Sequence, residues 1–383
     1  MITRLRVKNY LSLQDVDFKL NSRNNVLVGL NMAGKSNLID CFKFLTQMVT
    51  NGLQQAFLDR GGFSEVIWKG KHTNRIILQL SATNDDTNEI YDYGITILGS
   101  ATDAIAVEEE RLVVKAGNQA ITLIDLNNCQ GKVTHWDGSI AFSPPGPGHS
   151  ALEFNVPGWA GTDVQAFVAS WRFYHLLPAL MKQPNTATNQ TFLTENGDNF
   201  SSWLLTLRTN YPEEFRMLEQ AATDIFPDLD AVLTPLTQFI ASASSREKHL
   251  HHPIPLRHMS DGEVTFLAWL SLIFAPENLG SSFLCAEEPE NHLHPHLLEI
   301  LVELLLQHQN GLGTQAAQVI ITTHSPYLID RFNLDDLIVA DKWEGATPCT
   351  SPASKEHLRK LLERGELGLG NLWFAGALSE DVR

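Results

Sequence analysis

The chain has 383 residues, of which 43% are hydrophobic and 19% charged, and this ordinary globular balance excludes a largely disordered protein. Its 44 acidic and 28 basic residues give a formal net charge of −16, which excludes a protein that coats nucleic acid by general charge neutralisation. The four cysteines form no CxxC pair, so we expect reduced thiols in a cytoplasmic protein. No apolar run of about 18 residues predicts a membrane span, and the N-terminus lacks a signal core.

Strands dominate the first part of the chain. Residues 2–20 read as two short strands, residues 25–30 as a buried strand entering a glycine turn, and residues 37–49 as a helix with one apolar face. Residues 75–143 contain strand-like segments separated by Asn, Asp and Gly turns, which predicts an antiparallel sheet. A loop rich in proline and glycine follows at 143–150.

The middle of the chain turns helical from about residue 163 to residue 240. We expect residues 171–177, WRFYHLL, to lie in the core of such a helix, with a partner interface as the alternative. Residues 241–256 are polar and predict a flexible loop. Apolar strands and helices then alternate again to beyond residue 320, which predicts a mainly parallel sheet covered on both faces.

Residues 29–36, GLNMAGKS, fit the pattern G-x-x-x-x-G-K-[ST] between a predicted strand and a predicted helix. Glycines let the backbone curl so that its N–H groups face phosphate oxygens, and the helix N-terminus adds a positive dipole end. Lys35 would neutralise the β- and γ-phosphates, and Ser36 would offer its hydroxyl to Mg²⁺. The predicted nucleotide contacts are Gly29, Asn31, Gly34, Lys35, Ser36 and Asn37.

An apolar strand at 283–286 ends in two carboxylates, Glu287 and Glu288. Glu287 stands where an acid that supports magnesium belongs, and Glu288 where a general base that polarises the attacking water belongs. A strand running into an acidic surface turn would give the same pattern. The preceding phosphate loop favours the catalytic interpretation.

Two further signals flank these carboxylates. Ser260 and Glu263 have the S-x-x-E spacing of a capping box, and a capped helix start beside Gly262 can receive the γ-phosphate of a nucleotide held by another subunit. His324 follows a buried strand. A lone histidine is usually structural, but this position in the order of motifs favours a γ-phosphate sensor.

These four signals, in this order, resemble the ABC ATPase superfamily, and the wider pattern resembles the bacterial AAA family ATPases of the SMC, RecF and OLD-like branch. The resembling stretches are GLNMAGKSNLID, MSDGEVTFLAWLSLI, EEPENHLHP, QVIITTHSPYLID and the tail GELGLGNLWFAGAL. The resemblance implies an α/β fold, a P-loop NTPase of the ABC type with an antiparallel β lobe and a helical insertion. We expect the first lobe at 1–150, the insertion at 151–250 and the second lobe at 251–383.

The resemblance also implies how the site is shared between two heads. The residues expected to act on one ATP and its Mg²⁺ are Lys35, Ser36, Glu287, Glu288 and His324. Of these, Ser36 and Glu287 would hold the metal, and Lys35, Glu288 and His324 would be catalytic. Ser260 and Gly262 would complete the site of the facing subunit, so ATP would join heads into a homodimer or higher oligomer.

Several departures and rivals narrow this interpretation. Asp261 replaces a glycine of the transporter signature, and the stretch from Gly29 to Glu287 is too long for a compact transporter head. Too few residues follow His324 for the Toprim nuclease domain that OLD-type proteins add. Met32-Ala33 replaces the usual Gly-Ser or similar pair of the phosphate loop, and this change should be tolerated. The Q-loop glutamine stays unassigned among Gln54, Gln55 and Gln79.

Histidine clusters at 292–296 and 249–252 raise a metal site as an alternative. The first falls in the D-loop of the family and the second in the polar loop, so we expect a dimer-contact loop and a plain polar loop. The best candidate for an anionic or nucleic-acid contact is the local basic cluster of Arg246, Lys248 and Arg257.

The predicted reaction is in-line attack of water on the γ-phosphate of ATP, with Mg²⁺ as cofactor. By resemblance, the expected setting is bacterial anti-phage defence, in which hydrolysis controls a separately encoded effector protein. The alternative is a DNA-repair or chromosome-maintenance ATPase of the RecF or SMC type that senses DNA structure. The sequence names neither the effector nor the trigger.

Overall fold

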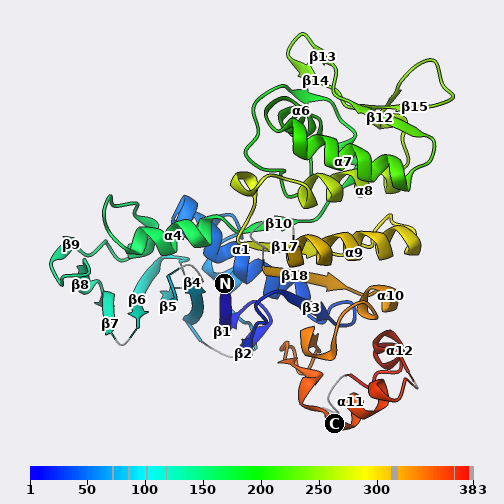
Figure 1. The fold of residues 1–383 in the computed structure, drawn as a ribbon. Coiled ribbons are helices and arrows are strands. Elements are labelled where there is room, and N and C mark those ends of the chain that lie inside the picture. The colour runs from blue at the N-terminus through cyan, green and yellow to red at the C-terminus, as the bar shows by residue number, and fades with distance from the viewer. Residues whose placement is uncertain are drawn as a thin grey trace. The chain divides into compact units, whose positions relative to one another are not determined.

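The computed structural model describes residues 1–70, 73–84, 87–100, 102–117, 119–311, 318–365 and 367–378. The chain divides into two compact units. The first unit joins Met1–Trp171 to Asn333–Arg383, and the second comprises Arg172–Phe332. Each is described by itself below, with the element labels of Figure 1.

An antiparallel sheet forms the largest part of the first unit (Figure 1, blue to cyan). Its strands, in spatial order, are β2 (Leu13–Lys19), β1 (Ile2–Tyr10), β4 (Arg75–Asn84), β5 (Glu89–Gly99), β6 (Ile105–Ala116), β7 (Gln119–Asn127), β8 (Gln130–Thr134) and β9 (Ile140–Phe142). Alternate residues along β1 are buried, Leu5 and Val7 among them, as expected of a strand with one face on a core. The antiparallel sheet predicted for 75–143 is confirmed, and it also takes in the two N-terminal strands.

Helix α1 (Lys35–Asn51) lies against this sheet in the first unit and buries its apolar face. The ring of Phe44 meets Tyr10 of β1 edge-on, with centroids 5.5 Å apart. Arg60 bonds both carboxylate oxygens of Asp40 at 2.8 Å, which fixes the chain after α1 on the helix surface. The shorter helices of this region are α2 (Leu53–Leu58), α3 (Phe63–Val66), η1 (Ala151–Glu153) and α4 (Gly161–Ala169).

The C-terminal segment returns to the strand that leads into α1. Strand β3 (Asn24–Val28) pairs in parallel with β19 (Leu337–Ala340), which in turn pairs antiparallel with β20 (Cys349–Thr350). Residues far apart in the sequence therefore meet beside the phosphate loop. The remaining elements here are η4 (Leu334–Asp336), η5 (Pro352–Ser354), α11 (Glu356–Glu363) and α12 (Leu369–Phe374).

The second unit contains a parallel sheet and the helices that cover it. Strand β17 (Phe283–Glu287) pairs in parallel with both β10 (Arg172–Tyr174) and β18 (Gln318–Thr323), and every residue of β18 is buried. Helices α8 (Asp261–Ile273), α9 (Pro295–Gly311) and α10 (Pro326–Ile329) connect or follow these strands. The apolar, largely buried strands of this sheet match the parallel sheet predicted from the sequence.

The rest of the second unit combines helices with two small sheets. The helices are α5 (Pro178–Met181), α6 (Phe200–Asn210), α7 (Pro212–Ile225), η2 (Leu256–His258) and η3 (Glu277–Leu279). One sheet comprises β11 (Asn185–Thr186), β14 (Ile240–Ala241) and β13 (Leu236–Thr237), and the other β12 (Leu229–Leu233), β15 (Ser244–Glu247) and β16 (Ile254–Pro255). The indole N–H of Trp203 on α6 donates to Ser271 Oγ on α8 at 2.9 Å. This bond links α6 to one of the helices that cover the parallel sheet.

The helix predicted to continue through residues 171–177 is wrong. Helix α4 ends at Ala169, and residues 172–174 form β10, in which Phe173 is paired with Cys285 of β17. Aromatic residues fit a pleated surface well, and pairing with β17 overrides the local helical pattern. Tyr174 is buried against the ring of Trp269, so a partner interface at this side chain is excluded too.

The flexible loop predicted for 241–256 is also wrong in part. Ser244 and Ser245 are buried in β15, which pairs with β12 on one side and β16 on the other. Pairing within the sheet satisfies the main-chain N–H and C=O groups of these residues whatever their side chains are. The polar side chains therefore suggested a loop although the backbone forms a strand. In the described part of the chain, no helix has the length and apolar character needed to cross a bilayer. The structure shows no disulfide bond among the described residues.

Candidate functional site: a phosphate loop and a carboxylate cluster

The phosphate loop leaves the buried strand β3 and enters α1 through two constrained glycines. A side chain at Gly29 would meet the carbonyl oxygen of Ala340 at 2.5 Å. Gly34 has φ +100°, a conformation that residues with a Cβ rarely adopt. Between them Met32 has φ +67° and is exposed. The loop therefore curls as the motif predicts, with Asn31 and Ser36 on its exposed side.

Lys35 folds back across the loop that precedes it. Its side chain is buried, and Nζ donates to the carbonyl oxygens of Gly29 at 2.9 Å and Leu30 at 3.4 Å. A phosphate oxygen is a stronger acceptor for an ammonium group than a neutral carbonyl. The arrangement thus places one cation within a loop of neutral backbone donors, which suits a polyphosphate.

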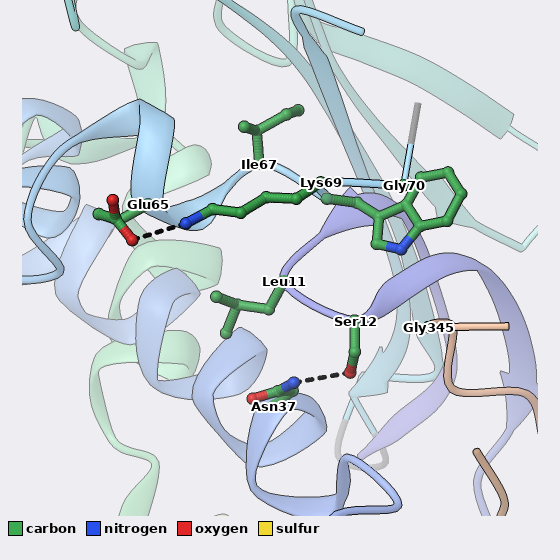
Figure 2. Close-up of a pocket in the computed structure, with 9 residues that line it drawn as sticks. Leu11, Ser12, Asn37, Glu65, Ile67, Lys69, Gly70 and Gly345 are labelled. Carbon is green, nitrogen blue, oxygen red and sulfur yellow. Dashed lines mark hydrogen bonds and ion pairs between the residues drawn. The ribbon is translucent and has the colours of Figure 1, made fainter. Parts of the chain in front are cut away.

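A pocket of about 440 Å³ lies beside the first turn of α1, in the same unit (Figure 2). Its residues come from the β1–β2 turn, from α1, from α3 and the chain after it, and from the turn before β20, namely Leu11, Ser12, Asn37, Glu65, Ile67, Trp68, Lys69, Gly70 and Gly345. The Asn37 amide donates to Ser12 Oγ at 2.6 Å, and the aliphatic chain of Lys69 spans the rim to Glu65. Apolar surface with a few polar groups is typical of small-molecule sites.

The second unit holds the predicted acids and the histidine close together. Glu287 ends β17, and Glu288 follows it with φ +46° and its N–H donating to the Thr322 carbonyl at 3.0 Å. His324 Nε2 lies 3.3 Å from Glu288 Oε1, and the Asn291 amide donates to Glu288 Oε2 at 3.0 Å. A carboxylate held on both oxygens beside an imidazole is suited to proton transfer with water.

Glu290 is a site residue that the sequence analysis missed. Its Oε1 accepts hydrogen bonds from Thr323 Oγ1 at 2.6 Å and from the His324 N–H at 3.0 Å. Its other oxygen, Oε2, is buried without a hydrogen-bond partner among the described residues. The residue stood within EEPENHLHP, but no local spacing assigned it a role, because both donors are more than 30 residues away.

The predicted capping box at the start of α8 is confirmed. The Glu263 N–H donates to Ser260 Oγ at 3.2 Å, and the Ser260 N–H donates to the Glu263 carboxylate at 2.8 Å. A side chain at Gly262 would meet the His292 carbonyl oxygen at 2.7 Å, so the turn 288–294 packs directly on this helix start. Ser260 is exposed there, and the first turn of the helix carries the carboxylates of Asp261 and Glu263.

Asp261 adds a negative charge to this helix start, and Lys182 of the same unit offsets it. The two side chains form an ion pair, and the His292 ring lies 3.8 Å from the other carboxylate oxygen. The Lys182 hydrogen bond, with the charges of Lys182 and His292, lowers the pKa of the Asp261 carboxyl. Asp261 is therefore a carboxylate at neutral pH, with a cation already beside it.

The histidine clusters form no metal centre within the described ranges, where no three His, Cys, Asp or Glu side chains gather as a metal would need. The basic cluster is largely engaged: Arg246 pairs with Asp230 at 2.6 Å, and Lys248 Nζ donates to the Pro227 carbonyl at 2.6 Å. The exposed hydroxyl of Ser36 in the first unit and the half-buried carboxylate of Glu287 in the second are each an oxygen ligand of the hard type that Mg²⁺ prefers.

Two families and one curated protein match the sequence. A family described as "AAA domain, putative AbiEii toxin, Type IV TA system" matches residues 169–330, and another described as "AAA domain" matches residues 4–134. The DNA double-strand break repair Rad50 ATPase of Sulfolobus acidocaldarius is 28% identical over 153 residues. That match covers 40% of this chain and only 16% of the Rad50 protein.

Solved structures of SMC head domains share the fold. An SMC head bound to the C-winged helix domain of ScpA gives a TM-score of 0.59 at 12% identity, covering 91% of this chain and 97% of that one. An SMC head with an extended coiled coil, bound to the C-terminal domain of ScpA derived from Pyrococcus furiosus, gives 0.54 at 12% identity, covering 96% and 99%. At this identity the likeness is one of fold.

Proposed function

We propose that this chain, whose fold is that of SMC heads and whose sequence matches two AAA-domain families, binds ATP with Mg²⁺ between two copies of itself and hydrolyses the γ-phosphate bond. The observation that carries the proposal is the phosphate loop with buried Lys35 at its centre, which leads from a buried strand into an α-helix. A bound Mg²⁺ would neutralise phosphate charge and polarise the bond that breaks. Ser36 and Glu287 would hold it.

The chain's own groups would divide the chemistry as follows. Lys35 would exchange its loop carbonyls for β- and γ-phosphate oxygens, and the loop N–H groups would contact the same oxygens. Glu288 would accept a proton from the attacking water, and Asn291 would hold that carboxylate in place. His324 would donate toward the γ-phosphate, since its backbone is fixed by Glu290.

The pocket beside α1 would receive the nucleoside end of ATP. Asn37 lines it and directly follows Ser36, so a ligand whose phosphates occupy the loop would extend toward it. Leu11, Ile67 and the methylenes of Lys69 provide the apolar surface on which a base can lie, and the Asn37 amide can bond its edge.

Ser260 and Gly262 would act on the ATP held by the facing copy. The capped helix start is exposed, and the turn with His292 packs against it, so the signature and the D-loop would enter a dimer interface together. Neither copy alone would then have a complete site, and ATP would act as the ligand that joins two heads.

For the biological role, we propose control of a separate effector protein in bacterial anti-phage defence, with the head acting in the cytoplasm. The match to a family named for the AbiEii toxin supports this choice. The second candidate is a DNA-repair or chromosome-maintenance ATPase, which the Rad50 relative supports. An effector gene next to this one would favour the first role, and stimulation of the ATPase by DNA ends or gaps the second.

A complementation experiment tests the shared site. Lys35→Ala removes the loop cation and should weaken ATP binding by at least about 100-fold, since several charge-assisted bonds are lost. Ser260→Arg should block the trans contact. Each variant alone should be inactive, but a 1:1 mixture should regain about a quarter of wild-type activity, because half of the dimers then contain one intact site.

The wild-type rate per head should also rise with protein concentration. Sedimentation at the same concentrations shows whether the variants exchange subunits. A mixture with no activity, in which mixed dimers are present, would refute the shared site. Lys35→Ala with near-normal ATP affinity would refute the phosphate loop itself.

A further inference from the structure

A chain of buried hydroxyl groups holds the phosphate loop from outside, and no motif contains it. Thr347 belongs to the turn between β19 and β20 and is 1% exposed. Its Oγ1 donates to the Ala33 carbonyl at 2.8 Å and lies 2.7 Å from Ser12 Oγ, while the Asn37 amide donates to that same Ser12 oxygen at 2.6 Å. Figure 2 shows the Ser12–Asn37 contact at the pocket wall.

The direction of the hydrogen bonds is fixed by chemistry. A carbonyl oxygen can only accept, so Thr347 spends its single proton on Ala33. Ser12 must then donate to Thr347, and its oxygen is left to accept from the Asn37 amide. The order Asn37 to Ser12 to Thr347 to Ala33 is therefore the only one that satisfies every group.

This chain of hydrogen bonds from Asn37 through Ser12 and Thr347 to Ala33, called the relay below, holds both ends of the loop's last turn. Ala33 lies before Gly34, and Asn37 lies in the first turn of α1. In a trans peptide the C=O and the next N–H point in opposite directions, so holding the Ala33 carbonyl on Thr347 turns the Gly34 N–H toward the opposite side, away from the relay. In a phosphate loop that is the side on which the phosphates bind.

The relay also explains the requirement for glycine at position 34. A Cβ there would lie 2.1 Å from Thr347 Oγ1 and 2.7 Å from Ser12 Oγ, far inside contact distance. The Thr347 N–H also donates to the Ser12 carbonyl at 2.8 Å, so the turn stays seated when only a hydroxyl is removed.

We propose that Ser12 and Thr347 are positioning residues of the nucleotide site, whose hydroxyl relay sets the direction of the Gly34 N–H toward the phosphates. The proposal rests on the phosphate-binding role argued above. It makes the C-terminal turn that carries Thr347 and Gly345 part of the site, because Gly345 lines the pocket together with Ser12.

The test compares hydroxyl deletions of equal shape. Thr347→Val should weaken binding of ATP by about 10-fold, near the upper range of one hydrogen bond, because Ser12 also loses its acceptor. Thr347→Ser should stay within about twofold of wild type. Thr134→Val is the matched control: Thr134 Oγ1 donates to the Thr122 carbonyl in the antiparallel sheet, so stability should fall without a change in affinity.

Binding of inorganic triphosphate separates positioning from contact with the base. A misdirected phosphate loop should weaken triphosphate by the same factor as ATP, whereas a disturbed pocket should weaken ATP alone. Ser12→Ala should match Thr347→Val, and the double variant should be no weaker than either, because both residues belong to one chain of bonds. Ser12→Ala also serves if Thr347→Val does not fold.

The result that overturns the inference is normal triphosphate affinity in both Thr347→Val and Ser12→Ala, while Lys35→Ala has lost it. Fully additive losses in the double variant would overturn the relay as a unit. A wild-type protein that binds neither ATP nor triphosphate would instead overturn the proposed function, and the inference with it. The three patterns are distinct in a single set of titrations.

Discussion

The phosphate loop and the carboxylate cluster are built on different physical principles. The loop in the first unit offers backbone N–H groups and one cation, Lys35, and it is held by neutral hydroxyl and amide groups. The cluster in the second unit consists of ionisable side chains, with Glu288, Glu290 and His324 joined by short contacts. One region is equipped to bind a polyanion, and the other to move a proton.

Both regions hold residues with side chains at positive φ, Met32 in the loop and Glu288 and His292 in the cluster. At the start of α1 the left-handed conformation falls on Gly34, where it costs little. Strain of this kind persists where the surroundings over-determine it, and it is frequent at functional sites. The difference between the two regions is therefore one of chemical groups, and it predicts that substitutions in the cluster change turnover, while those in the loop change affinity.

Glu288→Gln is the most direct test of this difference between the loop and the cluster, and we expect it to have the largest effect on turnover. The amide keeps the shape of the carboxylate but cannot accept the proton of the attacking water. Turnover should fall by about 10²–10⁴-fold while ATP still binds, because the lost interaction is made mainly in the transition state. Rapid-quench kinetics and equilibrium binding on the same protein measure the two quantities.

Glu287→Gln provides the contrast one residue earlier. If Glu287 supports Mg²⁺, nucleotide binding in the presence of magnesium should weaken as well as turnover. ATP-bound dimers should accumulate with Glu288→Gln only. A Glu288→Gln protein that hydrolyses ATP at the wild-type rate would return this residue to the role of an acidic turn.

A smaller effect is expected at Glu290, which acts through His324. Glu290→Ala removes the acceptor of both the Thr323 hydroxyl and the His324 N–H, so the histidine should lose its fixed position. We expect kcat to fall by about 10-fold with little change in KM, the size of one or two lost hydrogen bonds to a charged group. Glu290→Gln should recover most of the rate, because its amide oxygen can accept the same two bonds.

Glu303→Ala on α9 is the control for loss of an acid in the same unit, since among the described residues the Glu303 carboxylate has only a 3.8 Å contact with Arg331. It should leave kcat unchanged. Equal losses in Glu290→Ala and Glu290→Gln would mean that the charge of Glu290 matters rather than its acceptor geometry. Thermal unfolding of each variant separates either result from a loss of fold.

The parts of the site that could be predicted from sequence are those written in consecutive residues. The ABC-type fold class is confirmed, and the phosphate-loop conformation and the capping box at Ser260 follow from local backbone chemistry. Glu290 and Thr347 could not be found in this way. Glu290 bonds residues 33 and 34 positions away, and Thr347 lies 335 positions from Ser12. Only the folded chain brings such partners together.

The same reason explains why a helix was predicted for residues 171–177, of which 172–174 form strand β10. Its partner strand β17 lies more than 100 residues later, and the aromatic residues that it contributes also fit a helical period. Local pattern and long-range pairing disagreed there, and the pairing prevailed. The division of the chain at 150 and 250 and the roles of the site residues stay predictions, to be settled by the binding and kinetic measurements proposed here.

The smallest expected effect concerns Lys182. This residue sharpens the comparison between the two regions because it places a structural cation beside the start of α8, the helix that Ser260 caps. Asp261 puts a negative charge where the γ-phosphate of the facing subunit would approach, and Lys182 offsets that charge from within its own unit. Without the cation, Asp261 would repel the incoming phosphate. The helix start would then be a weaker anion site than its capped geometry suggests.

Lys182→Met should raise the ATP concentration needed for half-maximal activity by about 3-fold at low salt, the scale of one partly screened charge pair. The difference should shrink as ionic strength rises to about 1 M, where charges more than a few ångströms apart no longer interact. Lys115→Met removes a lysine paired with Asp92 in the antiparallel sheet, so it controls for net charge and should have no such effect. Combining Lys182→Met with Asp261→Asn should restore the wild-type value, because the double variant again has no uncompensated charge. If the double variant is as impaired as Lys182→Met alone, the lysine contacts the nucleotide directly and does not act through Asp261.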